Sequence, residues 1–404
     1  MTTAPLRPAE RLLVAALDER GSGTRAGLAR ATGLPGSTVV SLVAKLLADG
    51  VLVESPAAVT AHGRAGRPAK LLSLAGPRGL VAAVAVSRHE VRAGAVGLDG
   101  TLRAAAARPL ESLEVPDVVT PALAVLDEAL ASAGLDRTAL TGAVMGVPGP
   151  FRRGEGVVPL RDVPEPVRRF FPGSLSGWMR SDPAPDLARA LGVPAVAEND
   201  ANLGALGEAT HGAARGGAVS LYLKFAQGLG AGIVVGGRPL RGASGHAGEL
   251  AHVGVADDGP VCGCGRPGCL AMTTGPELLL HAMKRSYRDA TALDDLIALA
   301  EHGDRGVVRL LHDAGRLVGR PLADLCTVLN PHAVVVDGRL GAAAGPLVEG
   351  IREAVDRYAL APAAEAVRIV PGELGADAEL VGAAVLARQE AVSGPLFPGG
   401  DHAR

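Results

Sequence analysis

The segment from residue 242 to residue 270 constrains the fold of this chain more than any other part of the sequence. It holds three of the four cysteines, Cys262, Cys264 and Cys269, and His252 lies ten positions before the first of them. One imidazole and three thiolates form a closed ligand set for tetrahedral zinc, with no position left for a catalytic water. The sequence therefore predicts a structural Zn²⁺ ion that orders a glycine-rich loop.

Other interpretations of these cysteines remain open. The Cys-x-Cys spacing is tighter than the more common Cys-x(2–4)-Cys spacing, and the alternative is a set of free, buried thiols. A disulfide network is disfavoured, because four cysteines in 404 residues without an export signal point to a reducing compartment. The N-terminal apolar run at 12–17 ends at Asp18, so neither a signal peptide nor a membrane span is expected. We expect a cytoplasmic protein with no membrane partner.

Charge is distributed unevenly along the chain. Residues 1–80 carry ten Lys/Arg against five Asp/Glu, whereas the remainder carries thirty against thirty-seven. This asymmetry is expected of a small domain that binds a polyanion and is attached to a larger domain that does not bind it. Aromatic residues are only 2% of the chain, which argues against recognition of single-stranded nucleic acid by base stacking.

The first fifty residues predict three short helices. Apolar residues recur at helical spacing from Leu12, Thr24 is placed to cap a second helix, and Gly33 supplies the turn before a third. The third helix has an apolar stripe on one face and short hydroxyls with one lysine on the other, as expected of a recognition helix in a major groove. The candidate DNA-binding residues in the front of the chain are Arg25, Ser37, Thr38, Ser41, Lys45, Arg64 and Arg67.

Two extended segments follow, at 51–54 and 70–74, on either side of a loop with two Gly-Arg pairs that contain Arg64 and Arg67. Helices followed by two strands predict a winged helix-turn-helix, and cations on a thin, flexible backbone suit a phosphate or minor-groove contact. The alternative is a three-helix protein-interaction domain whose polar face is merely solvated.

From about residue 80 the pattern becomes α/β. Strands are expected at 80–86, 91–98 and 102–107, with Asp99-Gly100 as a hairpin turn, and strands then alternate with helices to a final helix at 379–389. Two similar hairpin-bearing sections, at 80–107 and 219–241, suggest a duplicated body of two lobes with a cleft between them.

Four segments together give the chain a resemblance to the ROK family, which is named for repressors, open reading frames and kinases. They are the segment Gly146-Val147-Pro148-Gly149-Pro150, the segment Glu198-Asn199-Asp200-Ala201-Asn202, the glycine-rich run at 228–232 and the histidine-cysteine segment. The resemblance covers essentially the whole chain. It implies an actin-like (ribonuclease H-like) body of two lobes, a sugar in the cleft, structural zinc and a homodimer or homotetramer.

The resemblance also implies how the chain is divided. The winged helix-turn-helix would occupy residues 1–76, and the effector and oligomerisation domain residues 77–404. Its small lobe would span about 77–195 plus the C-terminal helix, and its large lobe about 196–380. A winged helix at the front looks like that of the family's sugar-responsive repressors, whereas free-standing ROK sugar kinases usually lack it.

The same resemblance assigns an effector site to Gly149, Asn199, Asp200, Glu249 and His252. In ROK kinases the aspartate matching Asp200 is the general base, so here it would be a vestigial catalytic position. Asn and Asp are also ordinary helix caps, and the two roles can coexist. His252 would both contact sugar and hold zinc. Ala251 replaces a family glycine, and Ala271 stands where a sugar-binding glutamate is usual.

The phosphate side departs further from the family pattern. ROK kinases begin their first hairpin with Asp-x-Gly-Gly-Thr, whereas the corresponding turn here is Ser87-Arg88-His89-Glu90. The aspartate and the bare glycine backbone are both missing, so the kinase-like domain is expected to be inactive.

The sequence thus indicates a sugar-responsive regulator, most simply a repressor of carbohydrate metabolism genes, with double-stranded operator DNA and a small carbohydrate as partners. One alternative is a ROK sugar kinase with an attached DNA-binding domain. The other is a ROK regulator without a sugar effector.

Overall fold

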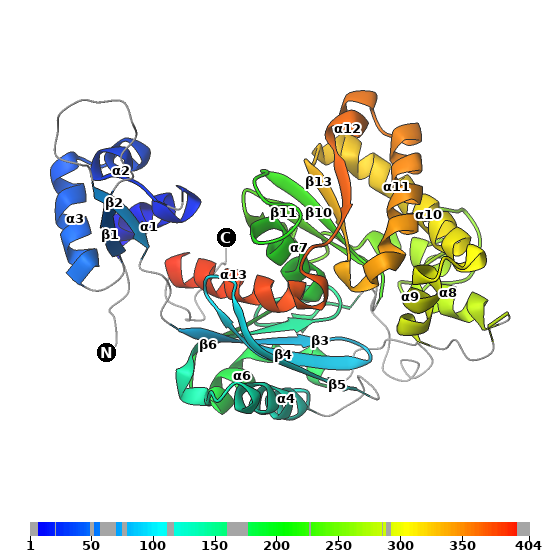
Figure 1. Cartoon of the computed structure of the whole chain (residues 1–404), viewed down its shortest axis with the longest axis horizontal. Helices are drawn as coiled ribbons and strands as arrows, with labels where there is room; N and C mark the ends of the chain where they lie inside the picture. The colour runs from blue at the N-terminus through cyan, green and yellow to red at the C-terminus, as the bar shows by residue number, and fades with distance from the viewer. Residues whose placement is uncertain are drawn as a thin grey trace.

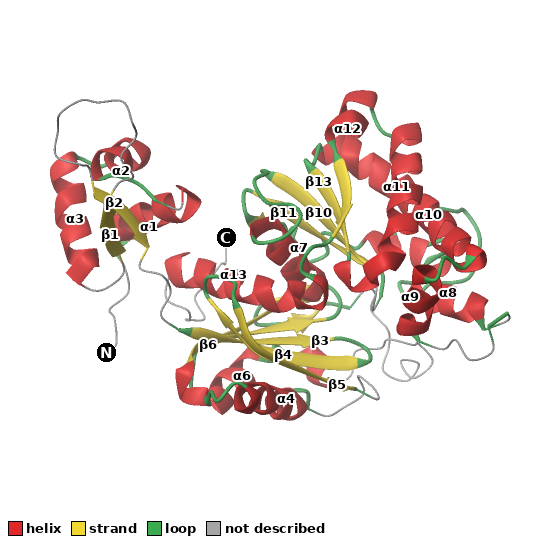
Figure 2. Cartoon of the chain, in the orientation of Figure 1, coloured by secondary structure: helices red, strands yellow, loops and turns green. Residues whose placement is uncertain are grey.

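The computed structural model describes residues 7–20, 22–48, 52–56, 70–74, 79–110, 117–159, 177–225, 228–284, 286–287 and 292–393. They form a small N-terminal unit and two larger lobes, each built on its own sheet (Figures 1 and 2). The expected domain boundary after residue 76 lies outside the described residues.

The N-terminal unit contains three helices and an antiparallel pair of strands. They are α1 (Pro8–Arg20), α2 (Arg25–Thr32), α3 (Gly36–Ala48), β1 (Leu52–Pro56) and β2 (Lys70–Leu74). Thr24 caps α2 by accepting a hydrogen bond from the Gly27 amide, and Gly33 ends it in the left-handed conformation, as the sequence predicts. Leu13, Leu28 and Val43 belong to a core of this unit's own.

Within the described residues no single helix is long and apolar enough to cross a bilayer. The pair α2 and α3, bent by 116°, meets that criterion only by length and composition.

The first lobe has a five-stranded mixed sheet in the order β5-β4-β3-β6-β9. Its strands are β3 (Leu80–Val86), β4 (Glu90–Gly97), β5 (Leu102–Pro109), β6 (Leu140–Val147) and β9 (Ala195–Asn199). The hairpin strands β3, β4 and β5 pair antiparallel, whereas β6 and β9 join in parallel. One face is covered by α4 (Val119–Ser132) and α6 (Ala184–Leu191), and the small pair β7 (Phe151–Arg152) and β8 (Gly156–Val157) lies nearby.

The second lobe repeats this topology in the order β12-β11-β10-β13-β14. Its strands are β10 (Val219–Lys224), β11 (Gly230–Val235), β12 (Arg238–Pro239), β13 (Ala333–Val336) and β14 (Arg368–Pro371). Its outer helices are α8 (Pro276–Met283), α9 (Leu293–Glu301), α10 (Arg305–Leu329), α11 (Ala344–Tyr358) and α12 (Ala361–Ala366). Three antiparallel strands followed by two parallel ones recur in both lobes, which confirms the expected duplication and the actin-like fold.

Two helices lie between the sheets, α7 (Asp200–Thr210) and the C-terminal α13 (Ala378–Ser393) (Figure 1). They pack against each other at unusually close range, because glycines occupy the contact. A Cβ atom on Gly207 would collide with the Ala378 carbonyl, and one on Gly382 with the Leu203 carbonyl. This pair joins the lobes and places the first residues of both helices beside the cleft.

The glycine-rich run at 228–232 leads into strand β11, which begins at Gly230 and pairs antiparallel with β10 as a hairpin. Gly232 is needed for packing, since a Cβ atom there would strike the Ala201 carbonyl of α7.

Candidate functional site

The histidine and the three cysteines converge. His252 ends a short 3₁₀ turn at Leu250–His252, and Cys269 directly precedes another at Leu270–Met272. A tight turn brings the first two thiols together, because the Gly265 amide donates to the Cys262 carbonyl. All four candidate ligand atoms lie within 4.8 Å of one another.

The geometry of these four groups fits the predicted metal. His252 Nδ1 lies 3.4 Å from Cys262 Sγ, and Cys264 Sγ lies 3.4 Å from Cys269 Sγ. Tetrahedral zinc with Zn–S bonds of about 2.3 Å requires neighbouring sulfurs about 3.8 Å apart, so only small adjustments are needed. None of the four cysteines forms a disulfide. The arrangement can therefore hold one metal ion with three thiolates and one imidazole.

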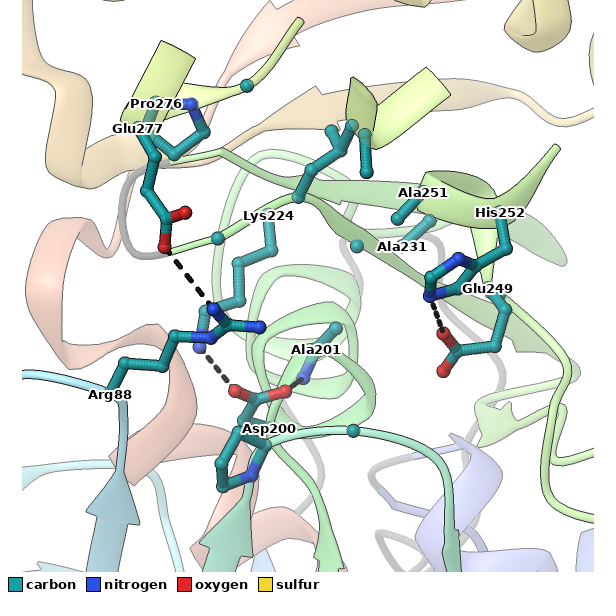
Figure 3. A pocket seen from close by; sticks show the side chains of 18 of the residues that line it. Arg88, Asp200, Ala201, Lys224, Ala231, Glu249, Ala251, His252, Pro276 and Glu277 are labelled. Carbon is teal, nitrogen blue, oxygen red and sulfur yellow. Dashed lines mark hydrogen bonds and ion pairs between the residues drawn. The ribbon is translucent and has the colours of Figure 1, made fainter. Parts of the chain in front are cut away.

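His252 also faces a cavity of about 350 Å³ between the lobes. Its second ring nitrogen, Nε2, lies 3.9 Å from a carboxylate oxygen of Glu249 (Figure 3). A metal on Nδ1 would fix the orientation of the ring toward this cavity. The structure thus couples the order of the metal loop to one wall of the cleft.

The cavity is lined by every residue that the sequence predicts for effector binding. These are Gly149, Asn199, Asp200, Glu249 and His252. They come from both lobes, because the first three lie on or after β6 and β9 and the other two belong to the loop that follows β12. Ala251 and Ala271, the two departures from the family pattern, also line it.

Asn199 and Asp200 combine capping with exposure to the cavity. The Asn199 side-chain oxygen accepts from the Asn202 amide at 2.9 Å, and its amide nitrogen donates to the Gly149 carbonyl at 2.8 Å. Asp200 Oδ1 accepts from the Ala201 amide at 2.7 Å. The cap that the residue types suggest is therefore real, and it holds both side chains at the base of the cleft.

Sequence reasoning missed Lys224, the last residue of β10. Its Nζ donates to Asp200 Oδ2 and to Glu379 Oε1, both at 2.7 Å, and all three side chains are buried. Arg339 completes the cluster at 3.5 Å from Glu379. The available signal was a single lysine in the run Leu-Tyr-Leu-Lys-Phe at 221–225, because a charged side chain on a buried strand needs a partner in place of water.

These charges shift one another's ionisation. Burial raises the pKa of Asp200, against the opposing effect of the Lys224 charge. Burial disfavours the charge on Lys224, yet its two carboxylate partners outweigh that effect and raise its pKa. Burial would raise the pKa of Glu379, but the positive charges of Lys224 and Arg339 outweigh that effect and lower it overall. Lys224 therefore remains a cation fixed beside the position that would serve as a general base.

Glu249 has an environment suited to hydroxyl groups. Burial, with the nearby Asp200 charge as the lesser cause, raises the pKa of Glu249 to about 7. Near neutral pH both its protonated and its ionised forms are populated, so it can donate to or accept from a polyol.

The turn between β3 and β4 is closed by hydrogen bonds between its first and last residues, Ser87 and Glu90. The amide and hydroxyl of Ser87 bond to the Glu90 carbonyl, and the Glu90 amide donates back to the Ser87 hydroxyl. Arg88 projects into the cavity and pairs with Glu277 of α8 at 3.3 Å (Figure 3). Side chains stand here where a phosphate cradle would need bare backbone.

The candidate DNA-binding residues divide into three groups. Ser37 and Ser41 are exposed on α3, and Thr38 is half-buried beside them. Arg25 forms an ion pair with Glu54 at 2.5 Å, and Lys45 forms one with Glu10 at 3.0 Å. Lys45 nevertheless remains exposed. Two further candidates, Arg64 and Arg67, lie outside the described residues.

Comparisons with known proteins agree with this geometry. The model of the ROK family matches residues 82–390. The xylose repressor of Bacillus subtilis is 26% identical over 374 residues, which cover 92% of this chain and 93% of that protein. A ROK family transcriptional regulator described as a homologue of the E. coli MLC protein superposes with a TM-score of 0.73 at 22% identity, over 95% of this chain and 96% of its own. A ROK family glucokinase from Streptomyces griseus, solved with glucose and AMPPNP, superposes with a TM-score of 0.63 at 26% identity, over 77% of this chain and 100% of its own.

Proposed function

Since this chain belongs to the ROK family, we propose that it is a sugar-responsive, DNA-binding transcriptional regulator that acts as a repressor and does not phosphorylate its ligand. It would act in the cytoplasm. The winged helix-turn-helix at 1–76 would bind DNA, and residues 77–404 would form the effector and oligomerisation domain. The genes that it regulates would be those of carbohydrate metabolism.

The main support for the proposal is that a single chain contains both a ROK cleft and an N-terminal unit in which the polar face of α3 is exposed. Ser37 and Ser41 are exposed there, whereas Val39 and Val43 of the same helix are buried. A helix with its apolar stripe buried and short hydroxyls outward can enter a major groove. The superposition on the Streptomyces griseus glucokinase covers 77% of this chain and all of the enzyme, so the enzyme is complete without about a quarter of this chain.

Carbohydrate binding is supported by the cleft. Asp200 and Glu249 offer carboxylates and Asn199 an amide, the groups that hydrogen-bond a ring of hydroxyls. Zn²⁺ held by His252 and the cysteines would keep this wall of the pocket ordered, and the ion would have a structural role only, because the four ligands close its coordination sphere.

Loss of phosphoryl transfer is supported at two places. The first hairpin turn contains Ser87 and Arg88 rather than open backbone, and it bonds to itself. Asp200, the vestigial base position, is held at 2.7 Å by Lys224. Its other carboxylate oxygen accepts from the Ala201 amide at 2.7 Å, so a sugar hydroxyl would have to compete with two donors for this carboxylate.

A route for the signal follows from α13. Its second residue, Glu379, bonds to Lys224 at the cleft, and the helix contacts α1 of the N-terminal unit. Closure of the lobes on a sugar would move α13 and with it the winged helix. In a homodimer or homotetramer, two recognition helices must sit about 34 Å apart to read adjacent major-groove faces, so a modest rotation is sufficient to weaken binding.

The test measures DNA release by the full chain. Fluorescence anisotropy with genomic fragments, across a salt series, should show affinity that falls steeply with salt and falls again on addition of the effector. Glu249→Gln and Asp200→Asn should abolish the effector response, whereas Glu365→Gln, an exposed change on α12, should not. Salt-independent binding would contradict the DNA role. A response that survives both cleft variants would contradict the sugar site and favour a regulator without a sugar effector.

A further inference from the structure

One carboxylate in the N-terminal unit is paired with two cations at once. Glu54 lies on β1, and its side chain is 20% exposed. Arg25 Nη2 donates to Glu54 Oε1 and Lys70 Nζ donates to Glu54 Oε2, both at 2.5 Å. Each oxygen of the carboxylate therefore has a cation of its own, and two positive charges share one negative charge.

Both cations lie where a winged helix-turn-helix would meet the DNA backbone. Arg25 is the first residue of α2, the helix before the predicted recognition helix α3, and such a helix crosses the phosphate backbone (Figure 1). Lys70 is the first residue of β2, the second strand of the predicted wing. The side chains of Arg25 and Lys70 are 33% and 59% exposed, so both have surface open to a phosphate group.

The charge of Glu54 opposes a phosphate group at this position. Glu54 has the same sign of charge as phosphate and is in direct contact with both cations. A phosphate that approaches must either draw the cations away from Glu54 or bind beside a like charge. Hydrogen bonds from Lys70 and Arg25 hold the pKa of Glu54 below its usual range, so the carboxylate is ionised at neutral pH.

The unit does not depend on this cluster for its fold. Strands β1 and β2 pair with each other along their whole length, and Leu28, Val43 and Leu72 are buried in the core of the unit. Ion pairs that are partly exposed add little to the free energy of folding. Removal of the Glu54 charge should therefore leave the unit folded and change its interaction with DNA.

We infer that Glu54 is an internal competitor of the DNA phosphates, which partly neutralises Arg25 and Lys70 and so limits the affinity of the N-terminal unit for DNA. This inference rests on the proposed function and adds a residue that sets the strength of DNA binding. A regulator has to leave its operator when its effector arrives. Weaker phosphate contacts reduce the difference in binding free energy that the effector has to supply.

The experiment is fluorescence anisotropy of the full chain on labelled DNA of mixed sequence, across a salt series from about 50 to 200 mM. Loss of one negative charge beside two cations adds about one effective phosphate contact. Glu54→Gln should therefore steepen the slope of log K against log salt by about 0.9 and tighten binding about fivefold or more at about 0.1 M salt. Glu54→Thr is a second neutral variant, because a β-branched residue suits a strand, and it should give the same change.

The matched control is Glu128→Gln. Glu128 also pairs with an arginine, Arg108 at 2.8 Å, but it lies on α4 of the body. The overall charge of the chain changes equally, and DNA affinity and salt slope should equal those of the wild type. Circular dichroism and thermal melting show whether each variant is folded.

The outcomes separate this inference from the proposed function. Unchanged or weaker DNA binding by a folded Glu54 variant would overturn the inference, since Glu54 would then orient the cations toward the DNA or play no part. Tighter binding by only one of the two neutral variants, or an equal increase in Glu128→Gln, would also overturn it. In each of these cases the wild type still binds DNA, so the proposed function stands. If the wild type shows no salt-dependent binding, the proposed function fails and the inference fails with it.

Discussion

Replacing Lys224 with methionine should destabilise the protein far more than removing one surface charge would. The lysine is 5% exposed and makes two charge-assisted hydrogen bonds at 2.7 Å, to Asp200 and Glu379. Removing one partner from a buried ion cluster leaves uncompensated charge and costs about 3–5 kcal/mol. Arg339 at 3.5 Å still compensates Glu379 in part, so we expect a value within that range rather than above it.

The assay is chemical and thermal unfolding of the wild type, Lys224→Met and the control Lys284→Met. Lys284 is exposed at the end of α8, and its loss should change the free energy of unfolding by no more than about 0.5 kcal/mol. The Lys224 variant should melt about 10 °C lower. Adding Asp200→Asn to Lys224→Met should recover part of the loss, because it removes one of the two orphaned charges.

The pH dependence has a definite sign. Burial already raises the pKa of Asp200 in the intact chain, and loss of the lysine raises it further. A carboxyl group whose folded pKa is raised loses stability as the pH rises through that value. The gap between the wild type and Lys224→Met should therefore be larger at pH 8 than at pH 5. A loss below about 1 kcal/mol, or a larger loss when Asp200→Asn is added, would refute the reasoning.

Three further predictions concern the metal, the reaction and the folding of the N-terminal unit. Elemental analysis of the purified chain should find one zinc per chain, and Cys262→Ser should reduce that content and lower the melting temperature; full zinc content in the variant would argue against its role as a ligand. A coupled assay with ATP and glucose, xylose or an amino sugar should show turnover well below about 1 s⁻¹, and ordinary enzyme rates would contradict the loss of phosphoryl transfer. Thr24→Ala should cost about 1 kcal/mol of unfolding free energy because it removes the cap of α2, whereas Thr24→Ser should cost much less; equal losses would show that the methyl group rather than the hydrogen bond matters.

Most of the fold could be predicted from local pattern. The strand at 80–86 and the Asp99-Gly100 turn are found as expected, because alternation and turn chemistry are written in consecutive residues. The metal cluster could be predicted equally well, because Cys262, Cys264 and Cys269 are close in sequence and cysteines so spaced most often bind a metal.

The charge cluster could not be predicted in the same way. Lys224 and Glu379 are 155 positions apart and meet only because α13 returns between the lobes. Nor did the sequence show that Gly232 serves packing against α7, since a glycine-rich run predicts a turn and not the neighbour that a Cβ atom would strike. An ion pair or a close backbone contact between residues far apart in the sequence produces no periodic pattern of residue types, so it cannot be predicted from local pattern.

The central claim is that a kinase-like cleft now acts as a sensor for a DNA-binding unit. Its most direct test is one titration in which carbohydrate or carbohydrate phosphate is added to the chain on labelled DNA, with magnesium ATP present and product formation followed in the same sample. The account predicts that DNA is released while no phosphorylated product accumulates. Steady phosphorylation with DNA binding unchanged would contradict it.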